Sequence, residues 1–256
     1  MQVASRLRAI LEGSDLWDPG TARSIQDPLS FRCVTQVHGA AKAAIDFARQ
    51  SVEVEINSAA ENPLVLPDDG AILSTGNFHV PALALGFDLV GLALAQVTSL
   101  ASNRILRLMS PAASGLPAFL TPRGGRRTGF ATLQKTLTSL GAEIRHLANP
   151  ASLDFFPVSE GVEDHATMAP LTVRKAGDIV ARLTFVLAIE LMAAAQALDL
   201  RGVPRMGRGT RAAYEAVRKE VPRLDEDRVI GPEVERLQDL IVSGRFLAAV
   251  RAVMSG

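Results

Sequence analysis

Apolar residues recur at three- and four-residue steps through most of the chain, which is typical of amphipathic α-helices. A run at residues 34–52 keeps this spacing for roughly five turns. Two longer runs, at about 81–109 and 170–198, are the most apolar segments of the chain. Shorter helical patterns cover residues 1–14, 130–148, 210–221 and 232–253. The spacing therefore predicts a series of long and short helices.

Extended structure is predicted at only one place. Residues 64–66 and 71–73 are short apolar pieces on either side of the turn Pro67-Asp68-Asp69-Gly70. Alternating runs of β-branched residues are scarce, and small side chains let neighbouring helices approach closely. The pattern indicates an all-α fold, a bundle of long antiparallel helices.

The run at 81–109 is long enough to raise the alternative of a membrane span. Asp88, Gln96 and several Gly and Ser residues interrupt it, and no basic segment precedes it. These features favour a central helix that other helices bury on every side.

The composition narrows the function classes. Among 256 residues, 27 Lys and Arg balance 27 Asp and Glu, so no net charge attracts nucleic acid or anionic lipid. The single cysteine, Cys33, excludes an internal disulfide and fits a reducing, cytoplasmic location. The four histidines lack metal-ligand spacing, and no Gly-rich phosphate loop follows a strand, so neither a metal nor a nucleotide is expected. Composition turns polar beyond residue 200, which divides the chain into a bundle at 1–200 and a helical extension at 201–256.

One loop stands out for its chemistry, the segment from Gln26 to Cys33. Pro28 keeps Asp27 out of the helical conformation, so a rigid turn feeds the next helix and carries Arg32. A planar guanidinium at a helix start can bind a carboxylate through two parallel hydrogen bonds. The alternative is that Arg32 forms an ordinary salt bridge with a nearby acid.

Further motifs bear on these alternatives. They are Gln26-Asp27-Pro28-x-Ser30-x-Arg32-Cys33, Asn62-Pro63-Leu64-Val65, Gly76-Asn77-Phe78-His79, Ser114-Gly115-Leu116-Pro117, Pro150-Ala151-Ser152, Glu163-Asp164-His165, Leu198-Asp199-Leu200-Arg201 and Gly209-Thr210-x-Ala212-Ala213-Tyr214. With these motifs in this order and spacing, the chain resembles the aromatic amino-acid ammonia-lyases of the histidine and phenylalanine type. The resemblance implies the C-terminal portion of the fumarase/aspartase-like fold of these lyases.

The resemblance covers only the C-terminal half of such an enzyme. The N-terminal half of these lyases carries an Ala-Ser-Gly tripeptide, which cyclises to the electrophilic methylidene-imidazolone, and a Tyr that acts as base. Ala113-Ser114-Gly115 spells the same tripeptide here, but its context matches a different loop of the family, and Tyr214 matches a structural position. The resemblance therefore implies that a partner chain supplies the prosthetic group and the base.

The resemblance also implies roles for individual residues. Arg32 would clamp the substrate carboxylate, Gln26 would hydrogen-bond the prosthetic group or that carboxylate, and Asn77 would support the clamp. Phe78 would pack over the electrophile, and Glu163 would receive the substrate's amino group or side chain, as in the histidine branch.

Two departures from the family pattern bear on activity. Leu29 stands where a substrate-contacting Tyr is usual, and Val162 stands where Gln is usual before the Glu. They leave two hypotheses for the function of the chain. It is either a subunit of a split ammonia-lyase or a catalytically inactive, lyase-like scaffold or regulatory subunit. Either is expected in a tetramer-based hetero-oligomer. The substrate, and the choice between elimination and aminomutase chemistry, stay open.

Overall fold

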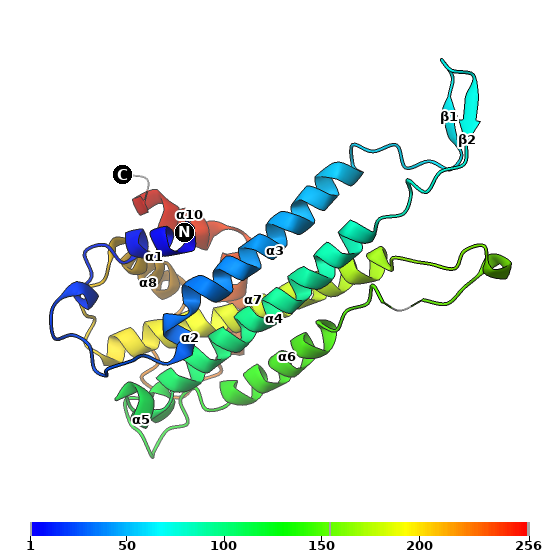
Figure 1. The fold of residues 1–256 in the computed structure, drawn as a ribbon. Helices are drawn as coiled ribbons and strands as arrows, with labels where there is room; N and C mark the ends of the chain where they lie inside the picture. The colour runs from blue at the N-terminus through cyan, green and yellow to red at the C-terminus, as the bar shows by residue number, and fades with distance from the viewer. Residues whose placement is uncertain (1, 154, 255–256) are drawn as a thin grey trace. The chain divides into compact units, whose positions relative to one another are not determined.

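The computed structural model describes residues 2–153 and 155–254, and these are mainly helical (Figure 1). The long helices are α3 (Val34–Glu55), α4 (Pro81–Leu108), α6 (Leu133–Leu147) and α7 (Ala169–Leu200). The two predicted strands form one antiparallel hairpin, in which β1 (Leu64–Leu66) pairs with β2 (Ala71–Leu73). The predicted all-α class and the hairpin are confirmed.

The shorter elements differ from the sequence pattern in places. The first helix, α1, is Gln2–Ile10 and is followed by a 3-10 turn at Asp15–Trp17. The one-turn helix α2 (Leu29–Arg32) precedes α3, and the one-turn helix α5 (Pro111–Ser114) lies in the loop after α4.

The prediction of one helix at 232–253 was wrong, because two helices occupy this segment. They are α9 (Gly231–Val242) and α10 (Arg245–Met254), which follow α8 (Arg208–Glu220). Gly244 separates them with a φ of 75°, a left-handed conformation that glycine adopts without steric cost. Apolar periodicity continues through the break, so only this backbone turn marks it.

The chain forms two compact units, each built from separate stretches of sequence. The first comprises the described residues of Met1–Gly39, Val97–Glu143 and Ala181–Gly256, and the second comprises Ala40–Gln96 and Ile144–Val180. Each unit has its own buried apolar side chains.

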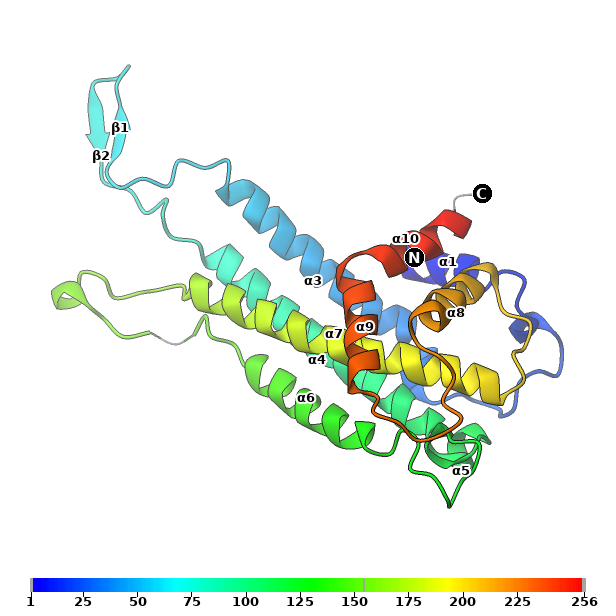
Figure 2. The same cartoon turned by 180° about the vertical axis from the view of Figure 1, so that it is seen from behind.

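In the first unit, α8 packs against α1, α9 and α10 (Figure 2). Its core includes large side chains that are almost fully buried, namely Ile105, Met109, Leu120, Phe130, Ile189, Met192 and Leu237. Gln196 is buried among them at 1 % exposure. Its amide donates to the carbonyls of Leu120 and Leu224 at 3.0 and 2.8 Å, and its oxygen accepts from the Leu224 N–H at 3.0 Å. One side chain thus satisfies three buried backbone groups.

In the second unit, small residues set the distance between helices. A Cβ placed on Gly86 of α4 would lie 3.1 Å from the Cα of Ala48 on α3, so the two helices approach closely at this point. Ala41, Ala44, Ala48 and Ala84 are all buried along this contact. The expectation that small side chains permit close helix packing holds here.

Among the described helices, α4 alone is long and apolar enough to cross a membrane by length and composition. Within its most apolar 18-residue window, 44 % of the residues are buried inside the structure. The prediction that other helices cover it on every side is only partly met, since Leu85, Leu89 and Leu92 are exposed.

Candidate active-site segments

The Gln26 segment is an irregular stretch followed by the single helical turn α2. Pro28 has φ −57° and ψ 152°, an extended conformation that ends the preceding loop and starts the turn. The Arg32 N–H donates to the Pro28 carbonyl at 3.2 Å, and the Cys33 N–H donates to the Leu29 carbonyl at 2.9 Å. The segment therefore has a defined backbone, as the Pro-based reading of the sequence predicts.

The side chains of Gln26, Leu29 and Arg32 are exposed, Leu29 by 59 %. Within residues 2–153 and 155–254, neither the Arg32 guanidinium nor the Gln26 amide has a side-chain hydrogen bond or an ion pair. The salt bridge considered for Arg32 from sequence is thus absent from the part of the chain that the structure describes. Its donors are available to a ligand or another chain.

The second set of predicted site residues lies in two loops of the other unit. Asn77 and Phe78 precede His79 in the loop before α4, and Glu163 lies in the loop before α7. The Nε2 of His79 and the Nδ1 of His165 are 2.7 Å apart, which joins the two loops by a hydrogen bond. This contact brings the loop of Asn77 and Phe78 next to the loop of Glu163.

Glu163 is held by its own loop. Its backbone pairs with Val158, and its Oε1 accepts a hydrogen bond from the Ser159 hydroxyl at 2.9 Å. Ser159, Glu160 and Gly161 have positive φ values of 52°, 56° and 85°, so the loop makes a sharp left-handed turn. Phe78 remains 54 % exposed, as it would in a site that another group completes.

Gln26, Leu29 and Arg32 therefore belong to the first unit, while Asn77, Phe78 and Glu163 belong to the second. Every predicted site residue is exposed.

A buried carboxylate anchors the loop that carries Glu163. Asp88 on α4 accepts hydrogen bonds from the N–H groups of Ala151 and Ser152, the shortest at 2.9 Å, and is 8 % exposed. These N–H groups start the loop at 151–168, where no helix can satisfy them. Asp88 interrupts the apolar run at 81–109, and its structural role is to accept hydrogen bonds from these N–H groups.

Replacing Asp88 with alanine is expected to lower the free energy of unfolding by about 2–4 kcal/mol, because the buried Ala151 N–H and the partly buried Ser152 N–H lose their acceptor. Denaturant unfolding of the two proteins measures the difference. Asp69→Ala, at an exposed hairpin turn of the same unit, is the control and should stay within about 0.5 kcal/mol of the wild type. Equal losses in both variants would contradict the anchoring role.

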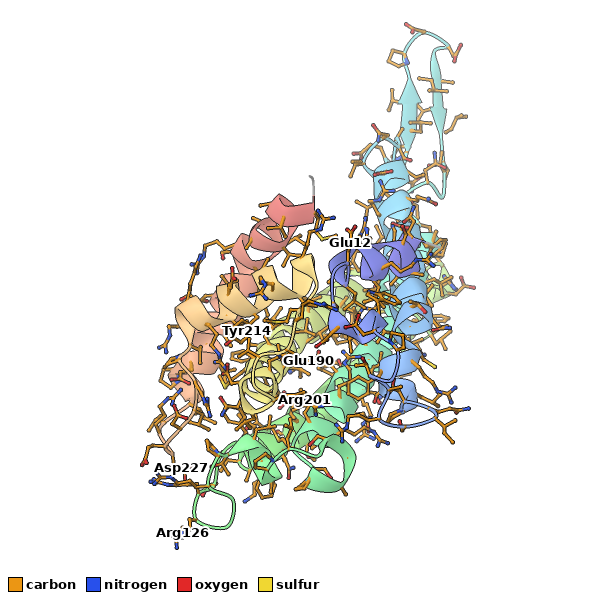
Figure 3. The ribbon with its side chains drawn as sticks, turned by 90° about the vertical axis from the view of Figure 1, so that its left-hand side faces the viewer. Glu12, Arg126, Glu190, Arg201, Tyr214 and Asp227 are labelled. Carbon is orange, nitrogen blue, oxygen red and sulfur yellow. The ribbon has the colours of Figure 1, made fainter. Side chains whose placement is uncertain are left out.

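The Ala113-Ser114-Gly115 tripeptide has a settled structural position. Ala113 and Ser114 end α5, and Gly115 caps it with a φ of 68°. The Gly115 N–H donates to the Pro111 carbonyl at 2.8 Å, and the buried Ser114 hydroxyl donates to the Ser110 carbonyl at 2.9 Å. Arg201, just beyond α7 (Figure 3), donates to the Ser114 carbonyl at 2.8 Å, as Arg23 also does. The backbone and hydroxyl groups of the tripeptide thus already serve the protein's own contacts.

One cluster of polar residues was not predicted from the sequence. Arg104 on α4 and Glu190 on α7 form a largely buried ion pair, with Nε 2.5 Å from Oε1 and Nη2 3.1 Å from Oε2. Glu190 is labelled in Figure 3. The Nη1 of Arg104 also donates to the Ser30 carbonyl in α2, at 3.1 Å. No local sequence signal links residues so far apart in the chain.

His38 lies within the electrostatic influence of this pair. Burial lowers the pKa of His38 below its ordinary value of 6.5, the positive charge of Arg104 lowers it further, and Glu190 opposes both. The unfolded chain therefore binds a proton at higher pH than the folded chain does. The contribution of neutral His38 to stability is complete above pH 6.5 and decreases as the pH falls towards the lower, folded-state pKa.

We expect His38→Gln to reduce the loss of stability on acidification, because glutamine has no proton to gain. Unfolding free energies measured at roughly pH 7.5 and pH 5.5 should differ more in the wild type than in the variant. The same acid-dependent loss in both proteins would show that His38 does not contribute.

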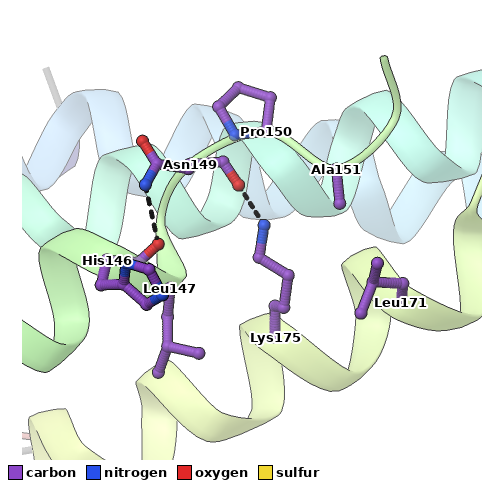
Figure 4. A pocket seen from close by; sticks show the side chains of 7 residues that line it. All are labelled: His146, Leu147, Asn149, Pro150, Ala151, Leu171 and Lys175. Atoms are coloured by element: carbon purple, nitrogen blue, oxygen red, sulfur yellow. Dashed lines mark hydrogen bonds between the residues drawn. The ribbon is translucent and has the colours of Figure 1, made fainter. Parts of the chain in front are cut away.

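A pocket of about 310 Å³ lies in the second unit, apart from the predicted site residues (Figure 4). It is lined by His146, Leu147, Asn149, Pro150, Ala151, Leu171 and Lys175. Lys175 donates to the Asn149 carbonyl, and the Asn149 amide donates to the His146 carbonyl at 3.0 Å, so its polar groups already satisfy one another. Within the described residues, no group of three or more His, Cys, Asp or Glu side chains could hold a metal ion.

Comparison with known proteins settles the family. The family described as aromatic amino acid lyase matches residues 1–219, most of the chain. The chain belongs to this family. The resemblance read from the motifs is thereby confirmed, and so is the lyase class at the level of the family.

Its relatives are ammonia-lyases and related enzymes. A histidine ammonia-lyase of Symbiobacterium thermophilum is 46 % identical over 254 residues, which cover 98 % of this chain and 50 % of the relative. The ergothionase of Treponema denticola, a solved structure, is 36 % identical with a TM-score of 0.91, covering 96 % of this chain and 50 % of its own. The tyrosine aminomutase of Streptomyces globisporus, also a solved structure, is 32 % identical with a TM-score of 0.90, and the match covers 98 % of this chain and 51 % of that one. The chain spans about half the length of these relatives.

Proposed function

We propose that this chain supplies the carboxylate-binding half of an aromatic amino-acid ammonia-lyase, which eliminates ammonia from histidine or a related α-amino acid. A separate chain corresponding to the N-terminal half would provide the methylidene-imidazolone and the base tyrosine. The observation that carries the proposal is the exposed Arg32 guanidinium, held on an ordered turn without an acidic partner in the described structure. An arginine of this kind can bind the α-carboxylate through two parallel hydrogen bonds.

The residues of this chain fit an electrophile that arrives from outside. Exposed Phe78 offers an aromatic face, and the exposed amides of Gln26 and Asn77 offer donors and acceptors. The Ala113-Ser114-Gly115 tripeptide fits less well as an internal source, because its groups already bond within α5 and with two arginines. When bound, the methylidene-imidazolone supplies the electrophile, while the residues of this chain orient the substrate against it.

Histidine is the favoured substrate class. Glu163 presents a carboxylate, which can pair with an imidazole or ammonium group, and the Ser159 hydroxyl fixes one of its oxygens. The identity of 46 % to a histidine ammonia-lyase supports the same choice. The chain is also similar to an aminomutase and to ergothionase. Two alternatives to the elimination of ammonia therefore remain, a shift of the amino group and the elimination of a different nitrogen group.

The active complex is proposed to be a tetramer-based hetero-oligomer in the cytoplasm. Ala82, Leu85, Leu89 and Leu92 repeat on α4 at steps of three and four residues and are all exposed. Such a stripe is the seam of helix–helix association, so helices of other subunits would cover it. We further propose that residues 1–200 carry the site loops and that 201–256 form a helical extension.

The second candidate is a catalytically inactive scaffold or regulatory subunit of a full-length relative. Leu29 and Val162 favour it, since both place apolar side chains where the family has polar ones, and both are exposed, Val162 by 84 %. The presence together of Gln26, Arg32, Asn77, Phe78 and Glu163 opposes it, because a scaffold requires none of them.

Mass spectrometry of the complex captured from its own cells tests the proposal. We expect a partner polypeptide of similar size, lighter than its sequence mass by the water lost in forming the prosthetic group. The isolated complex should convert histidine or another aromatic amino acid, which the absorbance of the unsaturated product reports. A complex with an unmodified partner and no turnover would support the scaffold, and a monodisperse monomer would refute the oligomer.

A further inference from the structure

The turn that carries Arg32 is too short to hold its own shape. The helix α2 has four residues, and a single helical turn is unstable in isolation because its few hydrogen bonds do not offset the ordering of its backbone. Only Cys33 separates α2 from α3, so the direction of the Arg32 side chain depends on α3 and on the side chains that contact α2.

Arg104 makes the contact that holds it. Its Nη1 donates to the Ser30 carbonyl at 3.1 Å, and Ser30 is the residue of α2 that is buried, at 7 % exposure. Ser30 lies two residues before Arg32, so this hydrogen bond fixes the turn directly beside the substrate clamp.

Glu190 in turn fixes Arg104. The two carboxylate oxygens accept from Nε and Nη2, which leaves Nη1 directed at α2. The side chains of Arg104 and Glu190 are only 12 % and 19 % exposed, so solvent screens the pair weakly and its geometry is constrained. A lysine could keep the charge pair, but its single ammonium could not hold both Glu190 oxygens and the Ser30 carbonyl in this arrangement.

We propose that Arg104, held by Glu190, is a positioning residue for substrate binding, which sets the direction of Arg32 through the Ser30 carbonyl. This inference rests on the proposed function, in which Arg32 binds the substrate carboxylate. Neither residue is close to the Arg32 segment in the sequence, and neither was among the residues expected to form the site.

The chain offers a matched control for the test. Arg228 also binds a buried carboxylate, that of Glu233, through Nε and Nη2, at 2.8 and 3.2 Å. It also donates to backbone carbonyls, those of Pro222 and Arg223, within the same unit. Arg228→Lys therefore removes an equivalent fork from a place that does not touch α2.

The first measurement is hydrogen exchange in the complex, which does not depend on activity. In Arg104→Lys the N–H groups of Phe31, Arg32 and Cys33, all bonded within this turn, are expected to exchange about tenfold faster than in the wild type. In Arg228→Lys they should exchange at the wild-type rate. Equal exchange in both variants would overturn the proposal.

The second measurement is steady-state kinetics of the assembled enzyme. Arg104→Lys is expected to raise KM about tenfold while kcat changes by less than about threefold, because a displaced clamp weakens carboxylate binding before and during the reaction alike. Arg228→Lys should leave KM unchanged. A raised KM in both variants would mean a general loss of structure and would overturn the proposal.

The two hypotheses fail in different ways. A wild-type complex without lyase turnover would remove the proposed function, while the exchange comparison would still test the contact with α2. If Arg104→Lys does not fold, the double variant Arg104→Leu with Glu190→Leu removes both charges together and leaves none buried alone. The control is the double variant Arg228→Leu with Glu233→Leu. Faster exchange of the N–H groups in α2 in the first double variant alone supports the proposal, and equal exchange in both overturns it.

Discussion

Replacing Arg32 with alanine is expected to lower kcat/KM of the assembled lyase by about 10²–10⁴-fold. If Arg32 binds the substrate carboxylate as proposed, the variant loses two charge-assisted hydrogen bonds to it, each worth about 1.5–3 kcal/mol. Arg32→Lys should give an intermediate loss, since it keeps the charge but not the fork. Steady-state kinetics on the complex with the N-terminal-half chain measures both.

Stability should hardly change in Arg32→Ala, because the Arg32 side chain is exposed and makes no side-chain hydrogen bond or ion pair within the described residues. Arg126, in an exposed loop (Figure 3), is the matched control, and Arg126→Ala should retain wild-type turnover. If Arg32→Ala also retained it, Arg32 would have no part in the mechanism. A large loss of folding in Arg32→Ala would instead assign it a structural role.

Replacing Gln196 with leucine is expected to lower the free energy of unfolding by about 3–5 kcal/mol, the largest stability effect anticipated here. The leucine fills a similar volume but leaves one N–H and two carbonyls without partners in the core, those of Leu224 and Leu120. Denaturant unfolding monitored by circular dichroism measures the loss.

Gln50→Leu provides the comparison, because Gln50 is exposed on α3 and the same exchange there leaves no buried group unpaired. Its effect should stay within about 0.5 kcal/mol. A small effect of Gln196→Leu would mean that water or a backbone shift satisfies the three groups, and the packing around Leu120 and Leu224 would then need another explanation.

Much of the fold was readable from the sequence, because it depends on local periodicity. The three- and four-residue steps predicted α3, α4 and α7 to within a few residues, and the turn Pro67-Asp68-Asp69-Gly70 predicted the hairpin. The break at Gly244 was missed because a glycine within an apolar pattern does not reveal the sign of its φ.

The candidate site was readable only in part. The order of the motifs identified the family and with it Gln26, Arg32, Asn77, Phe78 and Glu163, but the roles of these residues remain proposals. The sequence also showed Asp88 only as an interruption of an apolar run, whereas the structure gives it two N–H groups to satisfy.

By itself, then, the sequence determined most of the helices, the hairpin and the family, since each of these depends on short-range spacing and residue type. The tertiary structure alone decided which groups support them, such as Arg104 and Glu190 behind Ser30, Gln196 in the core, and His79 against His165. These contacts join residues that lie tens of positions apart in the sequence. Such pairings depend on where folding places the helices, and no periodicity along the chain encodes them.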